Sequence, residues 1–237
     1  MTTIDNAIIM AAGFGTRMRP LTYQTPKPLV KVAGQPMIES VIEGLHANHI
    51  KDISIVVGYL ANQFNYLVDK YPGVKLINNP YYEKYNNISS LYVARHELRN
   101  TVILDGDQVI MNPRILNREF QGSGYAGVAI NTFTDEWIMH VDAENNVVTC
   151  DRKGNDHGWR LYSLSKWNAK DSGQLKKLLE IEFEQLHHYD IYWDDIAMFD
   201  YADQFELKLL PINSGDIIEV DSLAQLDRLN TELGNNK

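Results

Sequence analysis

Two glycines and a lysine near the start of the chain could together bind phosphate groups and stabilise the charge on them. Gly13 and Gly15 directly follow an apolar run, so their unobstructed backbone N–H groups can approach phosphate oxygens closely. Lys27 stands between two prolines, which restrict the backbone on both sides of it. An ammonium group held on a stiff segment is suited to stabilising charge that develops on a phosphoryl group. Residues 13–27 therefore predict a phosphate-binding loop with a functional lysine, and an exposed lysine in a proline-rich loop is the simpler alternative.

This glycine loop differs from both common nucleotide-binding motifs. The dinucleotide-binding pattern would place a third glycine where this chain has Met18, and the P-loop pattern requires a Gly-Lys-Ser/Thr sequence that does not follow. We therefore exclude both motifs and expect a different kind of nucleotide site.

Carboxylates that could bind a divalent cation occur in two further segments. Asp105 and Asp107 end an apolar run, and Asp221 precedes the last stretch with helical apolar spacing. Mg²⁺ is usually held by one or two carboxylates together with phosphates and water. Ser222 and Gln225 form a plausible capping box, which would leave the Asp221 side chain unoccupied. On residue types alone, a turn around Asp107 and a helix N-cap at Asp221 remain open alternatives.

The elements that would position these residues alternate between strand and helix in the first half of the chain. Apolar runs typical of buried strands are residues 6–12, 53–58, 74–78 and 101–104, and helical apolar spacing occurs in 37–45, 64–71 and 89–98. This alternation predicts an α/β fold with a Rossmann-like, mostly parallel mixed sheet flanked by helices. Ligands bind at the carboxyl ends of such strands, so the loops after the first and fourth strands should face one crevice.

The second half of the chain shows a weaker pattern. We expect strands at residues 125–132, 161–165 and 217–220, a helix at 174–186, and a closing helix whose apolar face includes Leu223, Leu226 and Leu233. No repeat or low-complexity linker interrupts the chain. We therefore expect a single domain over residues 1–237, with a nucleotide-binding part at about 1–110 and an acceptor-binding part at about 111–237.

Composition limits the classes of function. The chain has 237 residues, 44% of them hydrophobic, and a formal net charge of -9, which disfavours nucleic-acid binding because that needs clustered Lys and Arg. The lone Cys150 cannot form an intrachain disulfide, and no apolar run is long enough for a membrane span. We expect a cytoplasmic protein that binds small molecules and not a membrane, while the oligomeric state is not indicated.

The stretch AAGFGTRMRPLTYQTPKPLVKVAGQPMIE, residues 11–39, resembles the signature of the sugar-phosphate nucleotidyltransferase superfamily. The resemblance implies that Lys27 and Arg17 act at the reacting phosphates, and that Asp107 and Asp221 bind Mg²⁺. The nucleotide-binding residues it implies are Ala11, Ala12, Gly13, Gly15, Thr16, Arg17, Lys27 and Asp105.

Three later segments, residues 85–92, 135–137 and 190–195, resemble bacterial CTP:phosphocholine cytidylyltransferases, which implies CTP and phosphocholine as substrates. The chemistry agrees, because a trimethylammonium group cannot donate hydrogen bonds and is best held by aromatic faces with negative charge nearby. The acceptor-binding residues expected on these grounds are Trp137, Tyr192, Trp193, Asp194 and Glu136. Further nucleotide contacts are expected at Gly58, Tyr81, Asn87 and Ser89, although Asn87 and Ser89 could instead cap a helix.

Two other functions remain alternatives. One is a nucleotidyltransferase that acts on a sugar 1-phosphate or on 2-aminoethylphosphonate, whose primary ammonium would favour carboxylates over an aromatic cage. The other is a catalytically idle, nucleotide-sensing subunit, which would be expected to have lost Lys27 or the metal-binding aspartates, whereas all of them are present.

Overall fold

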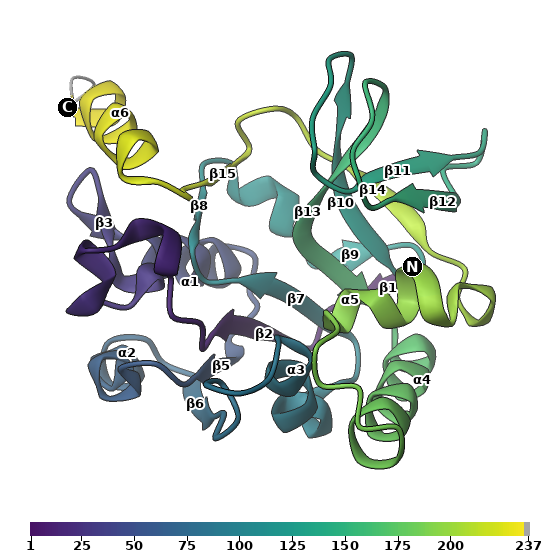
Figure 1. Cartoon of the computed structure of the whole chain (residues 1–237), viewed down its shortest axis with the longest axis horizontal. Coiled ribbons are helices and arrows are strands. Elements are labelled where there is room, and N and C mark those ends of the chain that lie inside the picture. Colours follow the sequence, from purple (N-terminus) through teal and green to yellow (C-terminus); the bar gives the residue numbers. More distant parts are fainter. Residues whose placement is uncertain (235–237) are drawn as a thin grey trace.

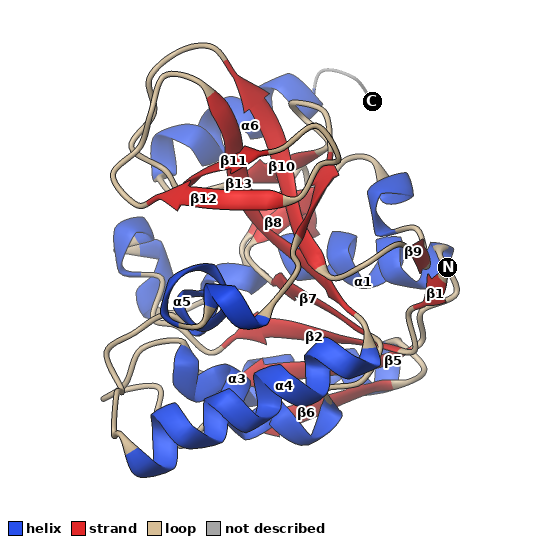
Figure 2. Cartoon of the chain, turned by 90° about the vertical axis from the view of Figure 1, so that its right-hand side faces the viewer, coloured by secondary structure: helices blue, strands red, loops and turns tan. Residues whose placement is uncertain are grey.

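A nine-stranded sheet runs through the protein, which we describe from a computed structural model over residues 1–234 (Figures 1 and 2). Four parallel strands lie in the order β7-β2-β5-β6, with bounds β2 Asn6–Ala11, β5 Asp52–Val57, β6 Val74–Asn78 and β7 Thr101–Asp105. The sheet continues from β7 through the antiparallel strand β13, Gly158–Trp167. The remaining strands of this sheet are β10 Gly124–Ile130, β11 Ile138–Val141, β12 Val147–Asp151 and β14 Lys208–Pro211.

Helices cover both faces of the parallel part (Figure 2). The α-helices are α1 Met37–Ala47, α2 Tyr66–Lys70, α3 Ile88–Ala94, α4 Ala169–Glu180, α5 Trp193–Asp195 and α6 Leu223–Gly234. Helix α1 packs on one face, and α3 and α4 pack on the other. No helix within residues 1–234 has both the length and the apolar character needed to cross a membrane.

Short elements complete the fold and connect its layers. Two-stranded pairs form between β1 Thr2–Thr3 and β9 Glu119–Phe120, between β3 Lys31–Val32 and β4 Gln35–Pro36, and between β8 Gln108–Ile110 and β15 Ile217–Glu219. The 3-10 turns are η1 Thr16–Met18, η2 Leu21–Tyr23, η3 Lys27–Leu29, η4 Ala61–Phe64, η5 Arg95–Glu97, η6 Pro113–Leu116 and η9 Ala202–Gln204. Two π-helical segments, η7 Ile181–Gln185 and η8 Ile196–Asp200, extend α4 and α5.

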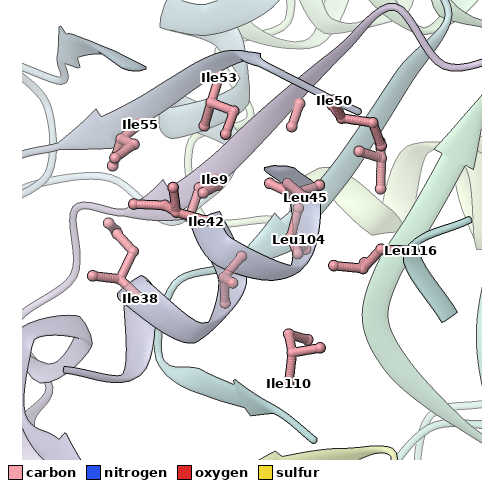
Figure 3. Packing of buried hydrophobic residues seen from close by; sticks show 14 of the residues in the cluster. Ile9, Ile38, Ile42, Leu45, Ile50, Ile53, Ile55, Leu104, Ile110 and Leu116 are labelled. Atoms are coloured by element: carbon pink, nitrogen blue, oxygen red, sulfur yellow. The ribbon is translucent and has the colours of Figure 1, made fainter. Parts of the chain in front are cut away.

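The core divides into two layers because successive side chains of a buried strand point to opposite faces. In β2, Ile9 packs with Ile38, Ile42 and Leu45 of α1, as Figure 3 shows, whereas Ile8 packs toward the helices of the other face. All five side chains are fully buried. The continuous apolar run that predicts this strand is thus explained by burial on both faces.

The expected elements are present, with some boundaries shifted. The expected helix 174–186 begins five residues earlier, at Ala169, because Asn168 caps it by accepting a hydrogen bond from the Asp171 N–H at 3.0 Å. Strands β11, β12 and β14 were not expected from the sequence. In β12 the side chains alternate poorly between buried and exposed, so the pattern that identifies a strand is weak there.

Candidate active site

A cavity of about 450 Å³ opens at the carboxyl ends of β2 and β7 and brings together most of the expected nucleotide-binding residues. Its lining residues are Met10, Ala11, Ala12, Gly13, Gly15, Thr16, Arg17, Lys27, Pro28, Asn86, Asn87, Ser90, Asp105 and Asp107. The loops after the first and fourth strands of the parallel part therefore face one crevice, as expected.

The glycine loop is shaped by a backbone conformation that favours glycine. Gly15 has φ +61°, and a Cβ added to it would lie 2.8 Å from the Cβ of Lys27. The hydroxyl of Thr22 donates to the Gly15 carbonyl at 2.8 Å and fixes the turn. Gly15 therefore allows the loop to close directly against the segment that carries Lys27.

Lys27 joins the two aspartates expected to bind metal. Its Nζ lies 2.6 Å from Asp107 Oδ2 and 2.7 Å from Asp221 Oδ1, and its side chain is only 9% exposed. Burial by itself would lower the pKa of the Lys27 ammonium, but the charges and hydrogen bonds of Asp107 and Asp221 outweigh it and raise that pKa above its ordinary value. The lysine is therefore a fixed positive charge at the edge of the cavity.

The position of Asp221 depends on the start of α6. The Ser222 hydroxyl accepts a hydrogen bond from the Gln225 N–H at 3.2 Å, and the Gln225 side chain accepts one from the Asp221 N–H at 2.7 Å. Ser222 therefore caps the helix as expected, whereas the Gln225 side chain bonds the N–H of the residue before the cap and not that of Ser222 as a capping box would require. The Asp221 carboxylate is left to pair with Lys27 and with Arg17, whose Nη2 lies 2.8 Å away.

An acidic second cavity of about 150 Å³ adjoins the first, since both are lined by Arg17, Lys27, Asp105 and Asp107. It is lined by Arg17, Lys27, Asp105, Asp107, Gln108, Glu136, Ser163, Glu219 and Asp221. Burial, followed by the nearby Asp107 charge, raises the pKa of the Asp105 carboxyl well above its usual range. Burial also raises the pKa of Glu219 to about 7, although Arg160 opposes this shift.

Gln108 in this second cavity is a residue that the sequence did not single out. Its side chain is 1% exposed, and neither its amide nitrogen nor its amide oxygen has a hydrogen-bond partner among the described residues. Such a group is costly to bury unless a ligand or water completes it. The only feature of the sequence that pointed to Gln108 was its position directly after Asp107. Asn86 and Ser90, which flank the expected Asn87 and Ser89, also line the first cavity without having been expected there.

The expected acceptor-binding residues are divided between the surface and the core. Trp137 meets Tyr192 edge-on, with 6.0 Å between ring centroids, and Tyr192 is 49% exposed. Trp193 instead lies in the core against Tyr125 and Trp167, because the turn of α5 points adjacent side chains in different directions. Burial raises the pKa of Asp194 to about 7, and Glu136 lines the acidic cavity.

Three expected nucleotide-binding residues do not line the cavity. Ser89 is fully buried, and its hydroxyl donates to the Asn86 carbonyl at 2.8 Å, so it serves the start of α3. Tyr81 stacks on Tyr85 with ring centroids 5.6 Å apart. A Cβ on Gly58 would lie 2.6 Å from the Tyr82 ring, which shows that this glycine makes room for the ring.

The chain matches a known protein family over most of its length. The model of the MobA-like NTP transferase domain matches residues 7–171, and the chain belongs to this family of nucleotidyltransferases.

Within the family the chain is similar to bacterial cytidylyltransferases over nearly its whole length. It is 39% identical to the 2-aminoethylphosphonate cytidylyltransferase of Lancefieldella rimae, over 93% of this chain and 90% of that protein. It is 35% identical to the choline-phosphate cytidylyltransferase of Streptococcus pneumoniae, over 97% of this chain and 98% of that protein. The solved structure of CTP:phosphocholine cytidylyltransferase from Streptococcus pneumoniae superimposes with a TM-score of 0.91 at 34% identity, covering 97% of this chain and 99% of that one.

Proposed function

We propose that this protein transfers CMP from CTP to phosphocholine and forms CDP-choline and pyrophosphate. The observation that carries the proposal is the meeting of Lys27, Asp107 and Asp221 at the edge of the cavity that the glycine loop lines. The aromatic pair of Trp137 and Tyr192 supports a quaternary ammonium acceptor. The relatives named as choline-phosphate and CTP:phosphocholine cytidylyltransferases support the same donor and acceptor.

Two carboxylates of the site support a role for magnesium. Among residues 1–234 no group of three or more His, Cys, Asp or Glu side chains is arranged to hold a metal ion. Mg²⁺ at a nucleotide needs only one or two carboxylates, because phosphates and water complete its ligands. Asp107 and Asp221 fit this role, since their oxygens already converge on one cation, the Lys27 ammonium. When bound there, Mg²⁺ would offset negative charge on the triphosphate.

The reaction then needs positioning and charge compensation more than proton transfer. A phosphate oxygen of phosphocholine attacks the α-phosphorus of CTP, a new P–O bond forms, and the bond to pyrophosphate breaks. The backbone N–H groups of Gly13 and Gly15 hold the triphosphate, while Lys27 and Arg17 offset charge on the transferring and departing phosphates. The attacking oxygen is already anionic, so no general base is required.

A second candidate acceptor is 2-aminoethylphosphonate. The acidic cavity and the unpartnered amide oxygen of Gln108 favour it, because a primary ammonium can donate hydrogen bonds there and a trimethylammonium cannot. The relative named 2-aminoethylphosphonate cytidylyltransferase adds to this support.

An assay of pyrophosphate release tests the proposal and separates the two acceptors. The purified protein is offered each nucleoside triphosphate with magnesium and with phosphocholine, 2-aminoethylphosphonate or glucose 1-phosphate. We expect release to be fastest with CTP and phosphocholine. Release with CTP and 2-aminoethylphosphonate alone would replace the acceptor and leave cytidylyl transfer intact.

A further inference from the structure

Two aromatic rings beside α5, those of Trp137 and Phe199, contact a cation that belongs to the protein itself, and the ring of Tyr192 adjoins Trp137. Trp137 meets Phe199 edge-on with 5.0 Å between ring centroids, and it meets Tyr192 edge-on on another side. The guanidinium carbon of Arg152 lies 3.7 Å from the centroid of the Phe199 ring and 5.6 Å from that of Trp137. Both separations are within the range of an attractive cation–π contact.

A buried carboxylate supplies the countercharge for this cation. Arg152 Nη1 lies 2.8 Å from Asp195 Oδ1, and the Asp195 side chain is only 4% exposed. The other carboxylate oxygen, Oδ2, accepts a hydrogen bond from the Tyr192 N–H at 2.8 Å, so the carboxylate is fixed at the start of α5. Aromatic faces at right angles with one fixed negative charge are the groups that bind a quaternary ammonium ion. We call Trp137, Tyr192, Phe199 and Asp195 the aromatic site.

The aromatic site borders the reaction cavities through its neighbours in the chain. The N–H of Trp193, next to Tyr192, donates to the side-chain oxygen of Asn87 at 2.9 Å, and Asn87 lines the nucleotide cavity. Glu136, next to Trp137, lines the acidic cavity beside Lys27. An acceptor with its phosphate near Lys27 could therefore place a cationic tail in the aromatic site.

The position of Arg152 allows its side chain to move out of the aromatic site. It directly follows β12 in a turn, its side chain is 46% exposed, and Asp195 has a second contact of its own, the hydrogen bond that its Oδ2 accepts from the Tyr192 N–H. Asp200 lies close enough for the Arg152 charge to affect its carboxyl: burial raises the Asp200 pKa, and Arg152 partly opposes the rise. After displacement, the Arg152 guanidinium can therefore be solvated and remains near the carboxyl group of Asp200.

We propose that Arg152 is a specificity-determining residue: its guanidinium fills the aromatic site, and a cationic acceptor binds by displacing it. This inference rests on the proposed function, because it assigns to the aromatic site the cation of the acceptor. It explains how the site can favour acceptors that carry a permanent cation. A neutral tail would leave the contacts of Arg152 with Phe199 and Asp195 without a replacement.

Binding of tetramethylammonium chloride tests the inference independently of catalysis. Ligand-observed NMR titrations, with sodium chloride as the ionic-strength control, compare the wild type with Arg152→Gln and Arg152→Lys. We expect Arg152→Gln to bind tetramethylammonium about tenfold more tightly, since the competing cation is gone, and Arg152→Lys to be intermediate. Arg114→Gln, which removes the same charge from an exposed position in η6, should match the wild type.

A different result would show that Arg152 only stabilises the fold and does not compete with the acceptor cation. A folded Arg152→Gln protein that binds tetramethylammonium no more tightly than the wild type overturns the inference, whatever happens to its melting temperature. If Arg152→Gln does not fold, unchanged binding in Arg152→Lys has the same meaning. In the pyrophosphate assay, KM for phosphocholine should fall by a similar factor while KM for CTP stays unchanged. A wild type inactive with phosphocholine would contradict the proposed function, and the tetramethylammonium titrations would still decide the role of Arg152.

Discussion

Lys27 holds together carboxylates that would otherwise repel each other. Asp107 and Asp221 both lie within 2.7 Å of its Nζ, and Arg17 adds a second positive charge at Asp221. Burial by itself would raise the pKa of Asp221, but the hydrogen bond and charge of Lys27 lower it overall. The Asp221 carboxylate is therefore ionised, the state in which it would bind a metal ion in the proposed mechanism. In the proposed mechanism, phosphates entering the cavity would offer Lys27 new anionic partners, and the two aspartates would become available to magnesium.

Replacing this lysine should slow the chemical step more than it weakens binding. We expect Lys27→Ala to lower kcat by about 10² to 10³, as loss of one fixed oxyanion donor does, with a much smaller change in KM for CTP. Steady-state pyrophosphate release measures both constants. Lys31→Ala, at an exposed position four residues later, is the matched control and should retain full turnover. Full turnover in Lys27→Ala would exclude the catalytic role.

Asp194 should make the stability of the ligand-free protein depend on pH. Its pKa is raised from 3.8 to about 7 by burial in the folded protein, so folding favours the protonated carboxyl. The resulting stabilisation is complete below about pH 4 and is lost as the pH rises through 7, up to about 4 kcal/mol in the free energy of unfolding.

Asp194→Asn removes this titration. Urea unfolding at pH 5 and pH 8 should therefore show the variant gaining stability relative to the wild type as the pH rises. An equal difference between the two proteins at both pH values would show that Asp194 has an ordinary pKa.

At the scale of elements, the glycine loop combines a structural glycine with one that is sterically free. Gly15 has a positive φ and lies against Lys27, whereas a Cβ on Gly13 would have no atom within 4 Å. We expect Gly15→Ala to lower both stability and kcat, because the strained backbone and the contact displace Lys27; the backbone strain alone costs about 1 kcal/mol. Gly13→Ala should keep the wild-type melting temperature and raise KM for CTP, since its methyl group obstructs the phosphates.

Thermal melts and steady-state kinetics on both variants check this pair. Equal melting temperatures for the two alanine variants would contradict the structural role of Gly15.

The parallel strands could be predicted from the sequence because most of their residues are buried and apolar. Ile8 and Ile9 face opposite layers of the core, and this produces the continuous apolar run that identifies β2. The glycine loop and both aspartates could be located because they follow such runs. The cap at Ser222 could also be predicted, since capping depends on residues only three apart.

The acceptor side could not be predicted to the same depth because its contacts join distant segments. Arg152 and Phe199 meet only when the turn after β12 packs on η8, and neither residue belongs to a local pattern. Trp193 was expected in the acceptor pocket, but the direction of α5 buries it beside Tyr125. The sequence marks Gln108 only by its position directly after Asp107, whereas the lack of partners for its buried amide is evident only in the folded structure. All of these positions are determined by tertiary packing, which cannot be inferred from the spacing of residues along the chain.

At the scale of the whole molecule, the two ends of the chain meet at the site. Lys27 and Asp221 are 194 positions apart and share a hydrogen bond of 2.7 Å. A separate apolar cluster joins Met18 and Val30 near the start of the chain to Leu226 and Leu229 of α6, which lies beside β3 in Figure 1. A ligand that spans both cavities would therefore contact the loop after β2, the loop after β7 and the segment before α6 together.

Binding of CTP with magnesium should consequently stabilise the entire fold. At a ligand concentration about 100 times Kd, the free energy of unfolding rises by about 2.7 kcal/mol. For a chain of this size that corresponds to an increase of about 5 to 10 °C in Tm. Because Asp107 and Asp221 hold the metal in the proposed mechanism, EDTA should reduce the shift at the same CTP concentration. Asp107→Asn with magnesium should then resemble the wild type with EDTA. An equal shift with and without magnesium in the wild type would mean that CTP binding does not depend on a metal ion, which would contradict the role of the two aspartates as metal ligands for the bound nucleotide.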